Sequence, residues 1–268
     1  MNKCLNNSLI LKVFANQIFN SIRNDKDYEH PFFLIEIIQR RKDNPNLDCP
    51  YKTLKWFAIY DGDSLSDSSE IMEEIVEFCK KTNSRAYFHV NVKDSRATVN
   101  SMLYLIGKWS NINNNTLDKL PECFYIAGRQ QESNIKQENM FWVIDFDYRD
   151  GFCPSNSSKL DLEMIEPGSL DTFYEDGFIN SVRNVFLNFI TKNLKEEIRQ
   201  NYESKCFSLK TVHGFHLILP PFDVTHEVKV SLMKELETKV LFFSEVIKEE
   251  KRIGDRIKKN NSTILWAP

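Results

Sequence analysis

Hydrophobic and polar residues repeat with two different periods along the first half of the chain. The segment "RAYFHVNV" (85–92) alternates strictly, so that its apolar residues share one side and its polar residues share the other. A period of two predicts a strand with one buried face. The segments "EIMEEIVEFCKK" (70–81) and "TVNSMLYLIGKW" (98–109) place apolar residues at helical spacing. Strands and helices therefore follow one another, which is typical of an α/β or α+β layer fold.

The second half begins with an apolar, β-prone run, "MFWVIDFD" (140–147). Further strands are predicted at "FSLKT" (207–211), at "GFHLIL" (214–219) and in the closing "STILWAP" (262–268). Helical spacing is found at about 178–199 and 226–248. The polar loop at 109–120 separates the two halves. We therefore expect an N-terminal α/β part at 1–120 and a core at 121–268.

Composition narrows the class of protein. The chain has 268 residues, 20 of them Phe, and a formal net charge of −3, so it can bury a large core and shows no overall basic character. Its six Cys are scattered, which predicts neither a zinc site nor a disulfide framework. We find no signal peptide and no segment that would span a membrane. A cytoplasmic protein without a membrane partner is expected.

Two carboxylates end the strand at 141–147. Side chains alternate along a strand, so Asp145 and Asp147 share one face while Phe146 takes the other. Carboxylate oxygens suit Mg²⁺ or Mn²⁺, and two metals about 4 Å apart can clamp the attacking and leaving oxygens of a phosphoryl transfer. The alternative is an edge strand that runs into a solvated acidic loop.

A glycine and histidine segment, "KTVHGFHLILPPFD" (210–223), precedes the next apolar strand. Histidine donors bind phosphate oxygens, and neutral histidine binds metals, so His213 and His216 are candidate ligands. Lys210 and Thr211 lie just upstream and could add contacts to an anion. The alternative is a β-turn whose histidines are merely exposed.

The segment "IGDRIKKNNSTILWAP" (253–268) places one acid before several bases. A metal–triphosphate site needs this combination, because the acid holds metal and the cations neutralise phosphate. Asp255 and Lys258 are the candidates here, and a charged surface turn is the alternative.

These three motifs, taken in this order, resemble the archaeo-eukaryotic primase superfamily, in particular its plasmid and phage primase-polymerases. Members carry an Asp-x-Asp at a strand end, then a Gly-x-His segment, then an Asp before a final strand. The resemblance covers about residues 140–268 and implies that Asp145, Asp147 and Asp255 are the catalytic metal ligands. It also implies that His216 contacts the nucleotide, with Thr211 in the small hydroxyl position and Lys258 as a basic partner. The departures are Gly254 before Asp255 and His213 before the Gly-x-His.

The resemblance implies a fold and an activity. The expected fold is an RRM-like antiparallel central sheet flanked by helices, with the N-terminal part as the other side of a cleft. The expected activity is DNA-templated nucleotidyl transfer in replication, with a two-metal Mg²⁺ or Mn²⁺ site and no zinc. Nucleoside triphosphates, single-stranded DNA and a replicative helicase are the expected partners. A metal-dependent nuclease and an inactive primase-like nucleic-acid-binding module remain as alternatives.

Basic residues in the first half extend the expected nucleic-acid site. Arg85 and His89 lie on the polar side of the strand at 85–92, and Arg40 and Arg41 are expected in a loop after a strand. Basic side chains of this kind contact the phosphate backbone. An ordinary solvated surface is the alternative for both pairs.

Overall fold

The chain folds into two compact units in the computed structural model. Unit 1 comprises Met1–Met140 and Asn261–Pro268, and unit 2 comprises Phe141–Asn260. The residues that the structure describes are 4–23, 28, 30–60, 67–110, 123–124, 126–128, 141–147, 183–184, 187–188, 192, 204–211, 214–220, 231, 257–260 and 262–268.

Unit 1 is built on an antiparallel sheet. Its strands are β1 (Leu5–Asn6), β2 (Pro31–Arg40), β3 (Tyr51–Tyr60), β4 (Arg85–His89), β5 (Lys93–Asp94) and β10 (Ser262–Ala267). Their order is β1-β10-β4-β2-β3, with β5 paired to β2 at the side of this path. Each pairing is antiparallel. The strand predicted at 85–92 is therefore present as β4, although it ends at His89.

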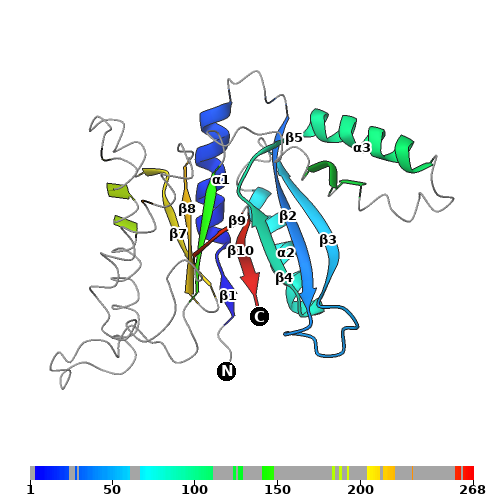
Figure 1. Cartoon of the computed structure of the whole chain (residues 1–268), viewed down its shortest axis with the longest axis horizontal. Helices are drawn as coiled ribbons and strands as arrows, with labels where there is room; N and C mark the ends of the chain where they lie inside the picture. The colour runs from blue at the N-terminus through cyan, green and yellow to red at the C-terminus, as the bar shows by residue number, and fades with distance from the viewer. Residues whose placement is uncertain are drawn as a thin grey trace. The chain divides into compact units, whose positions relative to one another are not determined.

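Aromatic residues join two helices to one face of this sheet (Figure 1). The helices are α1 (Ser8–Ile22) and α2 (Asp67–Thr82). From α1, Phe14 packs against Phe33 of β2 and Phe88 of β4, with ring centroids 5.8 Å and 6.1 Å away. From α2, Phe78 meets Phe57 of β3 edge to face at 6.5 Å. Aromatic burial of this extent is a main source of stability in a core.

The opposite face of the sheet is covered in part by residues 123–124 and 126–128. Phe124 stacks on Phe32 of β2 with a centroid distance of 6.1 Å. A Cβ atom at Gly128 would lie 3.4 Å from the side chain of the fully buried Lys93, so this helical segment approaches the sheet closely. The helix α3 (Ser95–Ser110) precedes this segment. Among the described residues, no helix is both long and apolar enough to cross a bilayer.

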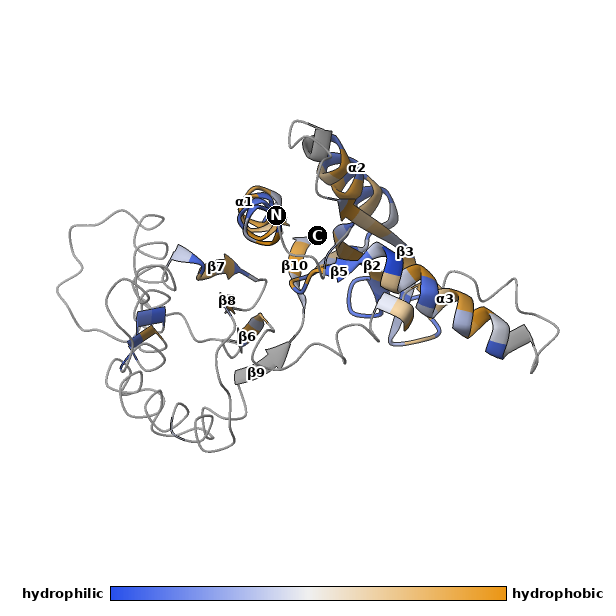
Figure 2. Ribbon diagram, turned by 90° about the horizontal axis from the view of Figure 1, so that it is seen from above, coloured by the Kyte–Doolittle hydropathy of each residue, from blue (hydrophilic) through white to orange (hydrophobic). Residues whose placement is uncertain are grey.

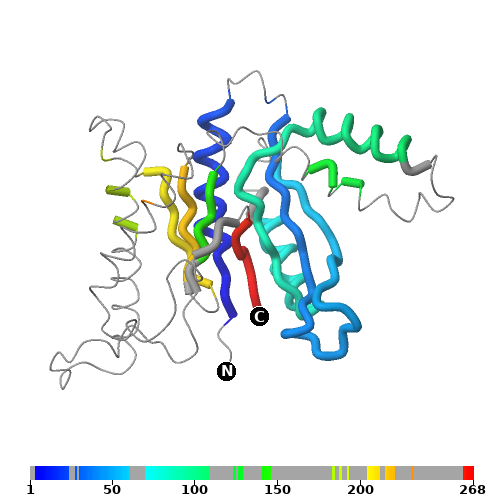
Figure 3. The backbone as a smooth tube through the Cα atoms, viewed as in Figure 1, coloured from blue at the N-terminus to red at the C-terminus, as the bar shows by residue number. Residues whose placement is uncertain are grey.

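The last strand of the chain is an inner strand of unit 1. Figure 3 shows β10 lying between β1 and β4. Asn7 fixes this arrangement, because its side-chain amide donates to the Ile264 carbonyl at 2.9 Å and its backbone N–H donates to the Leu265 carbonyl at 2.8 Å. Unit 1 therefore extends beyond the boundary predicted at residue 120 and also takes up 261–268, because the backbone of β10 hydrogen-bonds to strands from the start of the chain.

Unit 2 contains a second antiparallel sheet. Its strands are β6 (Trp142–Asp147), β7 (Phe207–Lys210), β8 (Gly214–Leu219) and β9 (Ile257–Asn260). Their order is β7-β8-β6-β9. The chain is thus an α+β protein with antiparallel sheets. The helices predicted at 178–199 and 226–248 lie largely outside the described residues, although 183–184 and 187–188 are helical.

Candidate nucleotide and metal site

The register of unit 2 aligns residues from three strands around Asp145. On one side Asp145 pairs with His216 of β8, and on the other it pairs with Lys258 of β9. Directly opposite residues on neighbouring strands have Cβ atoms about 4.5–5.5 Å apart and project to the same face. An acid, a histidine and a lysine, which lie far apart in the sequence, therefore form one row across the sheet.

A hydrogen bond joins the first two members of this row. His216 Nε2 lies 3.0 Å from Asp145 Oδ1. An ionised carboxylate can only accept, so Nε2 must carry the proton and donate it. The His216 and Asp145 side chains are 6% and 18% exposed, so the bond is largely shielded from water. The histidine fixes the orientation of the carboxylate, and its own ring is fixed in return.

The second acid occupies the next position on the same face. Asp147 pairs with Gly214, which has no side chain to fill the space across from the acid. Strand alternation places Asp147 on the Asp145 face, as the sequence predicts. The side chains of Asp147 and Lys258 lie outside the described part of the structure, so only their backbone positions enter this description.

Lys210 is the last residue of β7 and Thr211 is the residue after it, so the two residues differ in which face of the sheet they lie on. The Thr211 hydroxyl is buried and has no hydrogen-bond partner among the described residues. It stands two residues beyond Leu209, which pairs with His216. Lys210 instead pairs with Phe215, so the register places it on the opposite face from His216. Leu209 shares the face of His216, and Thr211 continues that face two positions later. Of the two candidates, only Thr211 is therefore on the His216 side.

Two predicted site residues, His213 and Asp255, lie outside the described residues. Strand β9 begins two positions after Asp255, with Ile257 opposite Phe146, so the strand that follows Asp255 pairs directly with the strand that carries Asp145 and Asp147. Within the described part of the chain, no group of three or more His, Cys, Asp or Glu side chains could hold a metal ion. The assignment of Asp255 as third ligand stays a prediction.

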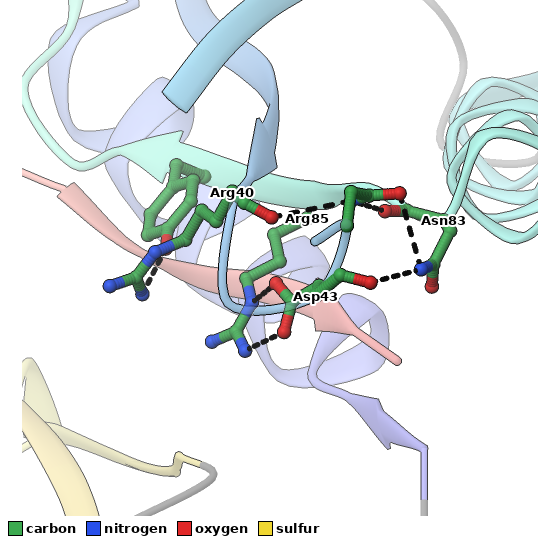
Figure 4. A network of polar contacts seen from close by, with 6 residues as sticks. Arg40, Asp43, Asn83 and Arg85 are labelled. Carbon is green, nitrogen blue, oxygen red and sulfur yellow. Dashed lines mark hydrogen bonds and ion pairs between the residues drawn. The ribbon is translucent and has the colours of Figure 1, made fainter. Parts of the chain in front are cut away.

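The basic candidates of the first half belong to unit 1, and Arg85 is used within it (Figure 4). Its Nε and Nη2 atoms donate to both carboxylate oxygens of Asp43, at 2.6 Å and 2.7 Å. These hydrogen bonds raise the pKa of Arg85 above its ordinary value. The same loop is tied to the end of α2, because Asn83 Nδ2 donates to the Asp43 carbonyl at 2.7 Å. Arg85 thus anchors the β2–β3 loop, and a nucleic-acid contact remains a prediction for it.

Arg40 and Arg41 are exposed, but both make contacts inside unit 1. Arg40 Nη1 donates to the Tyr87 hydroxyl at 3.4 Å, a long hydrogen bond that phosphate could replace. Arg41 donates to the backbone carbonyls of Leu47 and Asp48 across its own loop. Arg40 is therefore the more available of the two for a phosphate group.

His89 lies beside a buried acid. Its Nε2 atom is 3.8 Å from Glu36 Oε2, and both side chains are 8% exposed. Thr53 donates its hydroxyl to the other carboxylate oxygen of Glu36 at 2.9 Å. Glu36 has no role in the sequence-based predictions, although a single acid inside the apolar run "FFLIEIIQ" (32–39) is a usable signal for a buried polar group.

Comparison with known proteins adds no relative: no family model, no curated protein and no solved structure matches the chain. Any functional argument therefore depends on these residues and their geometry.

The Asp145 carboxylate is a donor of the type that hard divalent cations prefer. A carboxylate offers about four lone-pair sites, so the hydrogen bond at Oδ1 leaves Asp145 with capacity to bind a metal. Carboxylates that bind a metal commonly also accept a hydrogen bond from a neighbouring side chain that does not touch the metal. Asp145 and Asp147 would hold the ion, and the oxygen ligands favour Mg²⁺ or Mn²⁺.

Proposed function

We propose that the chain catalyses metal-dependent, DNA-templated nucleotidyl transfer, as primase-polymerases do. The observation that carries this proposal is the 3.0 Å hydrogen bond between His216 and Asp145, two residues 71 positions apart in the sequence. The Asp-x-Asp and Gly-x-His motifs are otherwise independent patterns. Their pairing in one register is what a single nucleotide site requires, and an accidental acidic loop would not need it.

The antiparallel sheet of unit 2 supports an RRM-like reading of the fold. Strand β6 lies between β8 and β9, so Asp145 has a paired residue on each side, and Asp147 is paired with Gly214 of β8. A site on inner strands is held more rigidly than a site on loops, and rigid placement is what positions reacting groups.

Each residue of the row has a role in the proposed reaction. A bound divalent ion would stabilise the charge that develops on the phosphate oxygens. Asp145 and Asp147 hold that ion, and His216 holds Asp145 in one orientation. Lys258 supplies a positive charge beside the acids for the triphosphate, and the Thr211 hydroxyl is a donor in need of an acceptor. Gly214 leaves room above Asp147.

The bond changes are those of nucleotidyl transfer. The 3′-oxygen of the growing strand forms a bond to the α-phosphorus, and the bond to the bridging oxygen of the β-phosphate breaks. Pyrophosphate leaves with the electron pair, and the hydroxyl proton passes to solvent. A replicative helicase is proposed as a partner, because primer synthesis follows the opening of a duplex.

The test is primer synthesis on single-stranded DNA with labelled nucleotides and Mn²⁺ or Mg²⁺. We expect products that lengthen with time, release of pyrophosphate, and loss of both in Asp145→Asn and Asp147→Asn. The matched control is Asp48→Asn, which removes a carboxylate from the β2–β3 loop of unit 1 and should leave synthesis unchanged. Pyrophosphate release that persists in both β6 variants would refute the assignment.

A nuclease is the second candidate, because a histidine fixed by a carboxylate can also act as a general base. Labelled single-stranded DNA incubated with Mn²⁺ and no nucleotide separates the two functions. Shortened DNA that disappears in His216→Ala would favour the nuclease. Absence of both activities, with no heat of Mn²⁺ binding by calorimetry, would indicate an inactive nucleic-acid-binding module.

A further inference from the structure

The outward side of α3 combines basic, aromatic and apolar residues. Arg96, Asn100, Tyr104 and Lys108 follow one another at intervals of four residues, and all four are exposed. On an α-helix this spacing forms one stripe with steps of about 6 Å. Beside it stands a second exposed row of apolar and small residues, Val99, Leu103 and Gly107.

This outward side is not the side that packs into unit 1. The buried Leu105 contacts Cys123 and Ala127 of the segment that covers the sheet, and Met102 and Ile106 pack beside it. These residues lie on the opposite side of the helix from the Arg96–Lys108 stripe. Figure 2 shows apolar and polar residues interspersed along α3. The helix therefore has a second surface, beyond the one that its own fold uses.

Large hydrophobic side chains are unusually open on this surface. Tyr104, Leu103 and Val99 are 68%, 62% and 49% exposed. Nothing lies within 4 Å of a Cβ atom built at Gly107. Helical side chains lean toward the N-terminus, so a large residue at 107 would cover Leu103 and Tyr104. The glycine keeps the Tyr104 ring and the apolar row accessible to a flat ligand.

The charged residues of α3 are all basic. Helix α3 contains no Asp or Glu, whereas the whole chain contains 38 of them. The nearest acid in the sequence is Asp94, and its carboxylate oxygens accept hydrogen bonds from the backbone N–H groups of Ala97, at 2.8 Å, and His30, at 3.2 Å. Asp94 thus caps the start of the helix, and Arg96 and Lys108 are the charged residues of the stripe.

We propose that the outward side of α3 binds single-stranded nucleic acid, with Tyr104 stacked on a base and with Arg96 and Lys108 on backbone phosphates. Non-specific single-strand binding combines cations along the backbone with aromatic platforms for the bases. Asn100 adds an amide that can bond to a base edge or a phosphate. A base is flat and apolar on its face, so it can also cover Leu103 and Val99.

Charge complementarity favours this occupant over two others. A protein partner would meet cations at both ends of the stripe and would need acids there to match them. A membrane would need a continuous apolar side, but polar Asn100 and Tyr104 stand in the middle of this one. The inference depends on the proposed function only in that it concerns the same class of substrate, and it makes no use of Asp145 or His216.

The experiment measures binding of the full chain to labelled oligothymidylate and oligouridylate by fluorescence anisotropy, in EDTA so that no chemistry occurs. Tyr104→Ala should weaken binding by about 5- to 150-fold, the range for loss of one stacked base. Tyr104→Phe keeps the ring and should bind like the wild type. The two probes show whether DNA or RNA is preferred.

The contribution of Arg96 and Lys108 is tested by measuring how the affinity for the oligonucleotides depends on salt concentration. Arg96→Gln combined with Lys108→Gln should lower the slope of log affinity against log salt by about 1.4, since each phosphate contact on a single strand contributes about 0.7. The matched control is Lys81→Gln, an exposed lysine at the end of α2, which should leave the slope unchanged. All of these residues are exposed, so thermal unfolding should be nearly the same in every variant.

Each outcome decides the matter. Unchanged affinity in Tyr104→Ala and an unchanged slope in the double variant would overturn the inference. The inference would also be overturned if these variants changed in mass by light scattering, or lost binding to anionic vesicles, while their affinity for the oligonucleotides stayed the same. Primer synthesis is scored separately. A chain that makes primers but binds DNA independently of α3 refutes this inference alone, and a chain that binds through α3 without making primers refutes only the proposed function.

Discussion

Replacing the two β6 acids one at a time isolates the contribution of His216. Asp145→Asn and Asp147→Asn each remove one of two like charges that stand about 7 Å apart on one strand face. That repulsion amounts to roughly 0.6–2.4 kcal/mol between the limits of water and a protein surface. Either variant relieves it equally, so it cancels when the two variants are compared with each other.

The difference that the described side chains show is the hydrogen bond to His216. Only Asp145 accepts from His216 Nε2, at 3.0 Å, whereas Asp147 stands opposite a glycine. A hydrogen bond to a charged group contributes about 1.5–3 kcal/mol and a neutral one about 0.5–1.5 kcal/mol. An asparagine keeps only the neutral bond. Without metal, Asp145→Asn should therefore be less stable than Asp147→Asn by about 1 kcal/mol.

The assay is urea unfolding of both variants in EDTA and again in Mn²⁺. A ligand at 100 times its Kd stabilises the folded state by about 2.7 kcal/mol, and both variants should lose most of that gain. His216→Ala should destabilise the wild type more than it destabilises Asp145→Asn. Equal stability of the two Asn variants in EDTA would mean that the His216 contact contributes nothing. Full stabilisation of Asp145→Asn by Mn²⁺ would remove Asp145 from the metal site.

Three further predictions concern unit 1. Asp43→Asn leaves the buried Arg85 charge without its bidentate partner and should cost about 3–5 kcal/mol in chemical unfolding, whereas Arg85→Met combined with Asp43→Asn should recover much of this loss. Burial raises the pKa of Cys79 to about 11. The folded thiol then keeps its proton at pH values where the unfolded thiol loses it, so stability should fall as pH rises from about 9 to 11, and Cys79→Ala should flatten that fall. Gly107→Ala, which meets no atom within 4 Å, should raise the unfolding free energy by about 0.5–1 kcal/mol, and a loss of stability would show that the space is needed.

Local pattern was sufficient for much of the fold. The strict alternation at 85–92 predicts the strand β4, and the apolar run before Asp145 predicts the strand β6. Helical spacing at 70–81 and 98–109 gives α2 and α3, each slightly longer than its apolar core, because polar residues extend a helix without contributing to its period. The shared face of Asp145 and Asp147 follows from strand geometry alone.

Pairing between distant strands could not be predicted in the same way. Nothing local in "STILWAP" indicates that β10 joins β1 and β4 instead of the sheet that contains β9. The carboxylate of Asp43 and the guanidinium of Arg85 lie 42 positions apart, so the role of Arg85 as a loop anchor depends on tertiary contacts. The outward surface of α3 was accessible from the sequence, because its basic and aromatic residues recur every four positions.

The insertion of β10 between β1 and β4 has a consequence for synthesis on the ribosome. Strand β1 reaches the rest of its sheet through β10, and β10 is translated after the whole of unit 2. At about 5–20 residues per second, the roughly 240 residues from the end of α1 to β10 take about 12–48 seconds to synthesise, and the sheet is incomplete during this time. The edge of β4 that will receive β10 is an open template for strand pairing during that time. Unit 1 therefore depends on late closure by β10, and chaperone binding or misassembly between neighbouring nascent chains would act in this interval.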